Sequence, residues 1–111
     1  MSVERKQTWG TPRAHKRFLL DIRLVARATS VHHGRTKDIS KGGLGATIAG
    51  DIKLGEVIEL EFQLPENPEP LRLQAEVRYR MGFQYGFQFL QAKEQQLESI
   101  SKATFLLIAA P

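Results

Sequence analysis

The strict alternation of apolar and polar residues in the second half of the chain constrains its fold more than any other feature. In residues 57–64 and 71–80, apolar side chains occupy every second position. Because successive side chains of a β-strand point to opposite faces, this period of two predicts two strands, each with one buried face. In the second strand the pattern places Tyr79 on the apolar face and Arg80 on the polar face. The segment between the strands is a loop, because it contains prolines, which cannot join a sheet interior: Pro65, Pro68 and Pro70.

Shorter alternating segments predict further strands on both sides of this pair. Residues 18–29 place apolar side chains on one face, residues 31–39 form a poorer strand, and residues 44–48 extend briefly beyond a cluster of glycines. A hairpin follows at Met81 and Gly82. Aromatic residues then occupy every second position of the last strand: Phe83, Tyr85, Phe87 and Phe89. We interpret these side chains as core, in preference to a stacking platform for nucleic acid.

The hydrophobic period changes from two to helical spacing near the C-terminus. From Ala92 onward the spacing predicts a helix with one face made of these residues: Leu97, Ile100, Thr104, Leu107 and Ile108. About six strands and one C-terminal helix, with one-sided burial throughout, predict a mainly β fold. We expect a small six-stranded antiparallel barrel, whose closure removes the exposed edges of the sheet.

Length and composition predict a single domain. The 111 residues match one domain, with a flexible N-terminal arm expected over residues 1–12 and the folded part over residues 13–111. The chain contains no cysteine, which excludes disulfides and thiolate chemistry. It also lacks the apolar segment of a secretory signal and the run of about 20 apolar residues that crosses a bilayer. These features favour a soluble, cytoplasmic protein.

Positive charge is concentrated in the first third of the chain. The chain carries 16 Lys and Arg against 12 Asp and Glu, a formal net charge of +4. Residues 1–41 contain ten of the basic and three of the acidic residues, for +7, whereas residues 42–111 contain six and nine, for −3. Such a basic segment indicates an anionic partner, which can be a nucleotide, a nucleic acid or an acidic surface.

The candidate binding residues gather in residues 38–45, which have the sequence Asp-Ile-Ser-Lys-Gly-Gly-Leu-Gly. Asp38 and Ser40 are two positions apart, so in an extended chain both side chains face the same way. We expect the three glycines of this segment to permit a turn with positive φ and a close approach of ligand to the backbone. A second segment, residues 13–17, places several cations just before the first strand.

Together the two segments resemble the signature of the PilZ domain family, Arg-x-x-x-Arg followed further along the chain by Asp/Asn-x-Ser-x-x-Gly. Arg13 and Arg17 match the first half, and Asp38, Ser40 and Gly43 match the second. The resemblance covers nearly the whole chain. It implies a small β-barrel and a ligand, cyclic di-GMP, with two phosphates and two guanines.

The resemblance also implies a role for each of these residues. The two arginines pair with phosphate oxygens or the guanine edge, or stack on a base. The carboxylate of Asp38 accepts from the N–H donors of guanine, while Ser40 adds a hydroxyl contact and Gly43 lets the backbone approach. Secondary candidates are Trp9, Lys16, Gly42 and Gly45. We expect the arm, residues 5–17, to be mobile without ligand and to close over it.

Other functions have less support. His32 and His33 are adjacent and face opposite ways in a strand, so they form no simple metal site, and the chain has no catalytic motif. We therefore expect neither an enzyme nor a bound cofactor. One alternative is a basic nucleic-acid-binding barrel, although the later strands have mixed or acidic polar faces. Another is a PilZ-like protein-interaction module that binds no nucleotide. A receptor of this size is expected to act on a separate protein partner.

Overall fold

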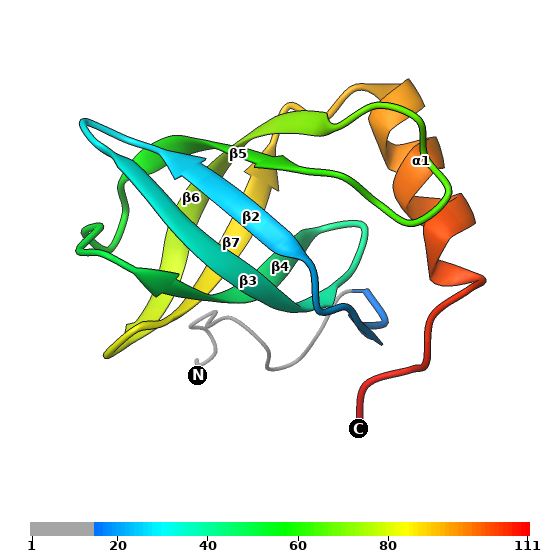
Figure 1. Ribbon diagram of the computed structural model, residues 1–111, viewed down its shortest axis with the longest axis horizontal. Helices are drawn as coiled ribbons and strands as arrows, with labels where there is room; N and C mark the ends of the chain where they lie inside the picture. The colour runs from blue at the N-terminus through cyan, green and yellow to red at the C-terminus, as the bar shows by residue number, and fades with distance from the viewer. Residues whose placement is uncertain (1–14) are drawn as a thin grey trace, which may run out of the picture.

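The computed structural model describes residues 15–111, which form a β-barrel flanked by one helix (Figure 1). The elements along the chain are β1 (Phe18–Leu19), β2 (Arg23–Arg27), β3 (Val31–Ile39), β4 (Gly43–Ala49), β5 (Val57–Phe62), β6 (Leu71–Met81), β7 (Gln84–Leu90) and α1 (Glu94–Thr104). The arm expected over residues 1–12 lies outside the described residues.

Six of the strands close into a ring. Their order is β3, β2, β5, β6, β7 and β4, and β4 returns to pair with β3. Every pairing is antiparallel, and β1 attaches to the end of β3, with Phe18 opposite Ile39. This arrangement confirms the six-stranded antiparallel barrel with a C-terminal helix that the sequence predicts.

The hydrophobic core fills the barrel as the alternation predicts. The inward-facing residues of β5 and β6 are at most 8% exposed: Ile58, Leu60, Phe62, Leu71, Leu73, Ala75 and Val77. Burying one large apolar side chain stabilises the fold by about 1.5–3 kcal/mol. These two strands therefore supply much of the stability that holds the other strands in register.

The segment predicted as one strand over residues 18–29 is two strands joined by a bend. β1 and β2 lie one after the other along the same side of β3. Between them, the hydroxyl of Thr36 donates to the carbonyl of Leu20 and accepts from the amide of Ile22 at 3.0 Å. Thr36 is only 2% exposed. Its side chain thus satisfies the backbone groups that the bend removes from strand pairing.

A β-bulge near the end of β6 reverses the predicted orientation of Tyr79 and Arg80. Pairing with β7 shifts register between Val77 and Tyr79, which leaves Arg78 as an extra residue. Beyond the bulge, Arg80 lies opposite Tyr85 with its guanidinium 5.1 Å from the ring centroid, and Tyr79 takes the outer face. The prediction was wrong because one extra residue inverts the alternation that follows it.

The aromatic strand is confirmed as core except at its first position. Tyr85, Phe87 and Phe89 are at most 8% exposed, whereas Phe83 is 63% exposed. Phe83 lies in the hairpin turn directly after Gly82, which has a φ of +62°, and β7 begins one residue later. The turn therefore removes Phe83 from the inward-facing set.

The helix α1 is confirmed, but it ends earlier than the spacing predicts. Ile100 and Ala103 are its buried residues, and the last helical residue is Thr104. The side-chain nitrogen of Gln96 donates to the backbone oxygen of Arg72 at 2.8 Å, which fastens the first turn to β6. Figure 1 shows α1 beside the end of the barrel that carries the β5–β6 loop.

The residues after the helix form a tail that returns to β1. Leu107 and Ile108, which the spacing places on the helix, lie in this tail. The amide of Leu19 donates to the oxygen of Ile108 at 2.7 Å, and the amide of Ala110 donates to the oxygen of Arg17 at 2.9 Å. The helix prediction failed here because backbone groups of the tail pair with β1 instead of continuing the helix.

Candidate ligand-binding site

The short strand β1 brings Arg17 and Asp38 together. Arg17 directly precedes β1, and the antiparallel pairing sets Leu19 opposite Asp38. Nη1 of Arg17 lies 3.6 Å from Oδ2 of Asp38, and the two side chains are 8% and 16% exposed. The fold thus places a guanidinium against a carboxylate in a largely buried setting.

A backbone amide holds the other oxygen of Asp38. Gly45, which lies opposite Asp38 on β4, donates its N–H to Oδ1 at 3.1 Å. A Cβ at Gly45 would come within 2.8 Å of the same oxygen. Glycine is therefore required here for the close approach of the carboxylate, which is the reason that Gly45 belongs to the site.

The turn between β3 and β4, residues 40–43, is braced by Ser40. Its amide donates to the oxygen of Gly43 at 2.8 Å, and its Oγ accepts from the amide of Gly42 at 3.1 Å. Ser40 is only 5% exposed. The expected positive φ in this turn is not found: among residues 15–111, the glycines with positive φ are Gly55 and Gly82. Close contacts with neighbouring side chains explain the glycines at positions 42 and 45, whereas a left-handed backbone conformation does not.

Two residues of the segment before β1 reach the neighbourhood of the turn. A Cβ at Gly42 would lie 2.8 Å from Cδ2 of His15, so the imidazole packs directly on this glycine. Nζ of Lys16 lies 5.9 Å from the ring centroid of Phe18. The sequence predicts Lys16 and Gly42 as secondary site residues. It does not predict the contact between His15 and the turn, because no motif or periodicity marks His15.

Most of the predicted site residues are neighbours in space. The structure gathers Arg17, Asp38 and Ser40 with the glycines of residues 42–45 around the β3–β4 turn. Arg13 and Trp9 lie outside the described residues. Thr36, which holds the bend before β2 and so positions β1, was not predicted, because a threonine in a strand is ordinary.

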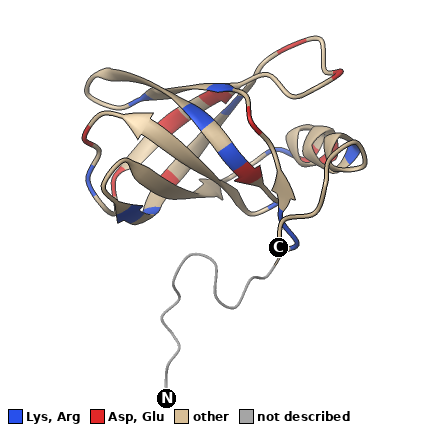
Figure 2. Ribbon diagram, turned by 60° about the horizontal axis from the view of Figure 1, so that its bottom comes forward, with Lys and Arg blue, Asp and Glu red and all other residues tan. Residues whose placement is uncertain are grey.

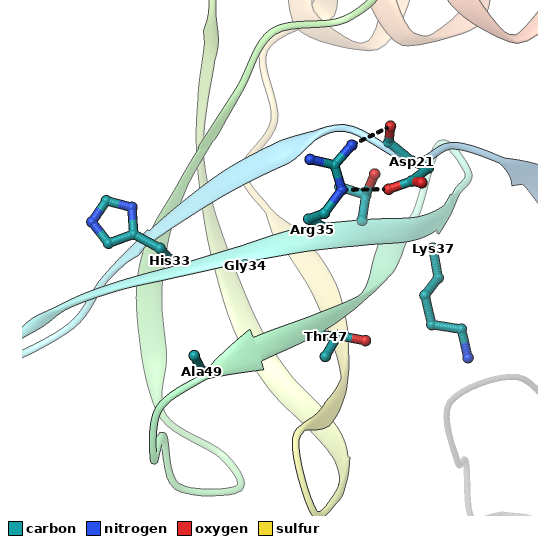
Figure 3. A pocket seen from close by; sticks show the side chains of 8 residues that line it. Asp21, His33, Gly34, Arg35, Lys37, Thr47 and Ala49 are labelled. Carbon is teal, nitrogen blue, oxygen red and sulfur yellow. Dashed lines mark hydrogen bonds and ion pairs between the residues drawn. The ribbon is translucent and has the colours of Figure 1, made fainter.

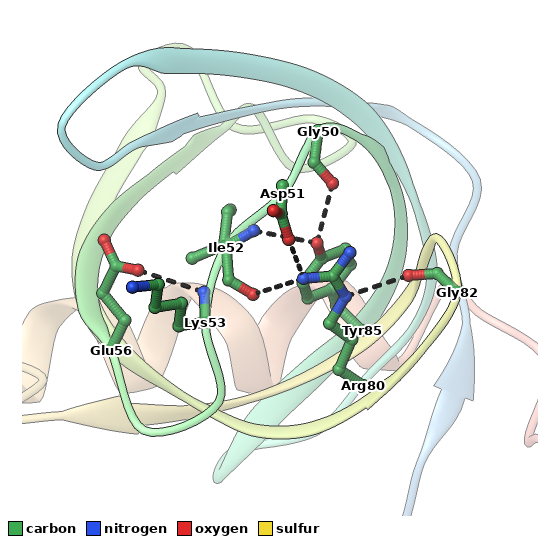
Figure 4. A network of polar contacts seen from close by, with 8 residues as sticks. All are labelled: Gly50, Asp51, Ile52, Lys53, Glu56, Arg80, Gly82 and Tyr85. Atoms are coloured by element: carbon green, nitrogen blue, oxygen red, sulfur yellow. Dashed lines mark hydrogen bonds and ion pairs between the residues drawn. The ribbon is translucent and has the colours of Figure 1, made fainter.

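A second polar cluster closes the opposite end of the barrel (Figure 4). The hydroxyl of Tyr85 donates to the oxygen of Gly50 at 2.8 Å and accepts from the amide of Ile52 at 3.0 Å. Arg80 donates to the carboxylate of Asp51 and to the oxygen of Ile52. The hydrogen bond from Arg80, followed by its positive charge, lowers the pKa of Asp51 below its ordinary value of 3.8. This cluster ties the β4–β5 loop to the β6–β7 hairpin.

Neither a metal centre nor a membrane-spanning helix is found in the part of the chain that the structure describes. No three His, Asp or Glu side chains of residues 15–111 come together in a way that could hold an ion. The described helix is too short to cross a bilayer.

Residues 11–106 match the sequence profile described as the PilZ domain. No functionally curated protein matches the chain in sequence. Among solved structures, the PilZ domain of YcgR from Escherichia coli with c-di-GMP superimposes with a TM-score of 0.73 at 17% identity, covering 86% of this chain and 91% of that one.

Two further solved structures share the fold. The PilZ domain of CeSA from a cellulose-synthesizing bacterium gives a TM-score of 0.64 at 19% identity, over 80% of this chain and 94% of that one. MotI/DgrA, an inhibitor of motility from Bacillus subtilis, gives 0.73 at 15% identity, over 86% of this chain and 50% of that protein. At these identities the likeness concerns the fold alone.

Proposed function

Because the chain belongs to the PilZ domain family, we propose that it is a receptor for cyclic di-GMP, bound beside the β3–β4 turn. The observation that supports this most directly is the pairing of β1 with β3, which sets Arg17 against Asp38. The YcgR domain of the same fold was solved with c-di-GMP.

The carboxylate of Asp38 is suited to select guanine. Gly45 holds Oδ1 and Arg17 faces Oδ2, so the carboxylate is oriented before any ligand arrives. Each carboxylate oxygen has two lone pairs, so both can accept a further hydrogen bond. The Watson–Crick edge of guanine presents neighbouring N–H donors. An oriented acceptor pair on the barrel surface binds this edge without reorganisation.

Arg17 and Arg13 supply the cationic side of the proposed site. A guanidinium offers a planar fork of donors that pairs with phosphate oxygens or with the O6 and N7 edge of guanine. Arg17 starts from a position against Asp38. Ligand binding then exchanges one anionic partner of this guanidinium for another, and Arg13, four positions earlier in the sequence, adds a second cation.

Ser40 and Gly43 shape the surface on which the ligand rests. The hydroxyl of Ser40 is engaged with the amide of Gly42 and lies 3.4 Å from the oxygen of Gly43. Its role in the proposed site is therefore to hold the turn, with any contact to the ligand secondary. Gly43 leaves its backbone uncovered by a side chain, so that a phosphate or ribose can approach.

The proposed receptor is a cytoplasmic adaptor and not an enzyme. Binding closes the segment around Arg17 over the ligand, and the changed surface regulates a separate protein partner. The tail offers a route for this change, because Ala110 is bonded to the backbone of Arg17 and Ile108 to that of Leu19. A displacement of Arg17 on binding is thereby passed to the C-terminal residues.

Calorimetric titration of the protein with cyclic di-GMP tests this function. Parallel titrations with GMP and with a random oligonucleotide test whether binding is selective for the cyclic dinucleotide. A charge-assisted hydrogen bond contributes about 1.5–3 kcal/mol, so Arg17→Ala should weaken binding by roughly ten- to a hundredfold. Asp38→Asn, which keeps the shape but removes the charge, should lose guanine selectivity and with it most of the affinity for cyclic di-GMP.

Two variants serve as controls for that titration. Arg72→Ala removes an exposed arginine from the outer side of β6 and should leave the affinity within twofold. Arg17→Lys keeps the positive charge but loses the planar fork, so it should bind better than Arg17→Ala and worse than the wild type. A folded protein that binds no cyclic di-GMP would contradict the proposal and leave a protein-interaction module as the function.

A further inference from the structure

A row of basic side chains lies on the outer face of the barrel beside the ligand site. Arg23 on β2 lies directly opposite Arg35 on β3, and like charges in such a cross-strand pair destabilise a sheet. His33 and Lys37 extend the row along β3, and both are exposed. Figure 2 shows bands of Lys and Arg on this part of the barrel wall. We call Arg23, His33, Arg35 and Lys37 the basic face.

The charge of the basic face is only partly neutralised within the molecule. Arg35 donates through Nε to Asp21 at 2.7 Å. Lys37 reaches across β4 to the side-chain oxygen of Gln84 at 3.0 Å, which is a neutral partner. The side chain of Arg23 has no hydrogen-bond or ion-pair partner among residues 15–111. Three permanent cations thus stand against one carboxylate.

The basic face borders an open depression of about 620 Å³. Its lining includes His33, Arg35 and Lys37 together with the small side chains of Thr47 and Ala49 on β4. Figure 3 shows Arg35 turned toward Asp21 and Lys37 turned away from it, with the two β4 residues on the next strand. The small residues leave room for an extended segment to lie between the cations.

We propose that the basic face docks an acidic segment of a protein partner, and that cyclic di-GMP bound beside Asp38 weakens this docking. Carboxylate side chains of an extended peptide match the spacing of cations along a strand. Nucleic acid fits less well, because single strands bind mainly through stacking on large aromatic side chains, and no phenylalanine, tyrosine or tryptophan lines the depression. The two strongly exposed phenylalanines of the described chain, Phe83 and Phe105, are not among its lining residues.

The coupling to cyclic di-GMP rests on the function proposed above. Lys37 directly precedes Asp38 on β3, so the two phosphates of the ligand would lie near one end of the basic face. Two negative charges at about one Debye length repel a carboxylate docked on Lys37 and weaken its binding by roughly two- to threefold. The nucleotide thus acts as a signal that releases an acidic partner.

Fluorescence anisotropy with a short fluorescein-labelled peptide of alternating Glu and Ser tests the docking. The matched probe has Gln in place of Glu, and a labelled oligo-dT tests the nucleic-acid alternative. At low salt, about 0.02 M, we expect saturable binding of the Glu peptide, which weakens as salt is added. Equal binding of the Gln peptide, or tighter binding of oligo-dT, would overturn the proposal.

Variants locate the binding on the basic face. The double variant Arg23→Gln/Lys37→Gln leaves the Arg35–Asp21 pair in place and should weaken the Glu peptide by roughly three- to tenfold. Arg72→Gln removes one exposed cation from β6 and should change binding by less than twofold. An unchanged affinity in the double variant would place the peptide elsewhere and overturn the proposal.

Adding cyclic di-GMP to the peptide complex tests the coupling separately. If calorimetry shows that the nucleotide binds, peptide affinity should fall in the wild type and stay unchanged in Asp38→Asn. Nucleotide binding without any loss of peptide affinity would overturn the coupling. If the nucleotide does not bind at all, the receptor function fails, while the peptide titration still decides whether the basic face docks an acidic segment.

Discussion

The two ends of the barrel both set an arginine against a carboxylate, but they hold the pair in different ways. At the α1 end, Nη1 of Arg17 lies 3.6 Å from Asp38, which exceeds the usual length of a hydrogen bond. At the opposite end, Arg80 donates to Asp51 and to two backbone oxygens, those of Ile52 and Gly82, each at 3.1 Å. The guanidinium of Arg80 is thus bonded to the backbone as well as to its carboxylate, whereas the contact between Arg17 and its carboxylate is longer than a hydrogen bond.

The Arg80 end of the barrel is built for stability, whereas the Arg17 end can rearrange. The ring of Tyr85 supports the guanidinium of Arg80, and its hydroxyl joins two backbone groups of the β4–β5 loop. Rearranging this end would break several hydrogen bonds at once. At the other end, Arg17 and Asp38 lie 3.6 Å apart, and Gly45 independently holds Asp38 through Oδ1. The end proposed to bind ligand is the one whose ion pair can exchange.

The largest expected effect on stability comes from Tyr85→Phe. The change removes the hydroxyl that bonds the amide of Ile52 and the oxygen of Gly50, and Ile52 is fully buried. Leaving buried polar groups unpaired should lower the free energy of unfolding by about 1–3 kcal/mol, as measured by urea denaturation. The affinity for cyclic di-GMP should stay within twofold. A large loss of affinity would show that the two ends are coupled.

Gly45→Ala should produce the converse result. The added methyl group would meet Oδ1 of Asp38 at 2.8 Å and turn the carboxylate away from Arg17. We expect the affinity for cyclic di-GMP to fall by roughly tenfold, or about 1.4 kcal/mol, with about 1 kcal/mol lost in stability. Calorimetry and urea denaturation of the same preparation measure both quantities. An unchanged affinity would mean that the orientation of Asp38 does not matter for binding.

Much of the fold follows from the sequence because β5 and β6 alternate without interruption. The period of two is a direct consequence of strand geometry, so a buried face can be assigned without the structure. The sequence-based strand predictions fail where a bulge adds one residue to a strand or where a side chain bends the chain. Arg78, Tyr79 and Arg80 continue the alternation in the sequence, and nothing in the pattern marks the bulge that turns Arg80 inward. Likewise, Thr36 bends the chain before β2 through side-chain bonds to residues far away in sequence.

The sequence singles out candidate site residues that lie close together in the structure, but it does not predict their contacts. Motif spacing singles out Arg17, Asp38 and Ser40, and the structure brings them together. The spacing does not show that the hydroxyl of Ser40 is already hydrogen-bonded within the turn. Nor does it show that Gly45 is needed to make room for a carboxylate on the neighbouring strand. These contacts depend on the register of β3 against β4, which a single sequence does not specify.

Gly42→Ala makes the same chemical change three residues earlier and should have a smaller effect. Its methyl group would meet the imidazole of His15, an exposed side chain, at 2.8 Å. Because that side chain can move aside, we expect a change of less than about 0.5 kcal/mol in stability and less than about threefold in affinity. The combination with His15→Ala should restore both. A loss as large as that of Gly45→Ala would assign His15 a positioning role in the ligand site.

Acidification should reveal the contribution of the Arg80–Asp51 pair, which is the smallest effect expected. The hydrogen bond and charge of Arg80 lower the pKa of Asp51 in the folded state below 3.8, so the unfolded chain takes up the proton first. The stabilisation is therefore complete above about pH 4 and is lost as the pH falls through the folded-state pKa. Thermal unfolding of the wild type and of Asp51→Asn should differ slightly at pH 7 and converge once the pH lies below the folded-state pKa of Asp51. Because Asp51 is 82% exposed in its side chain, the difference at pH 7 is small and should shrink further in high salt. A difference that persists in acid would instead assign the effect of the substitution to lost packing of the β4–β5 loop.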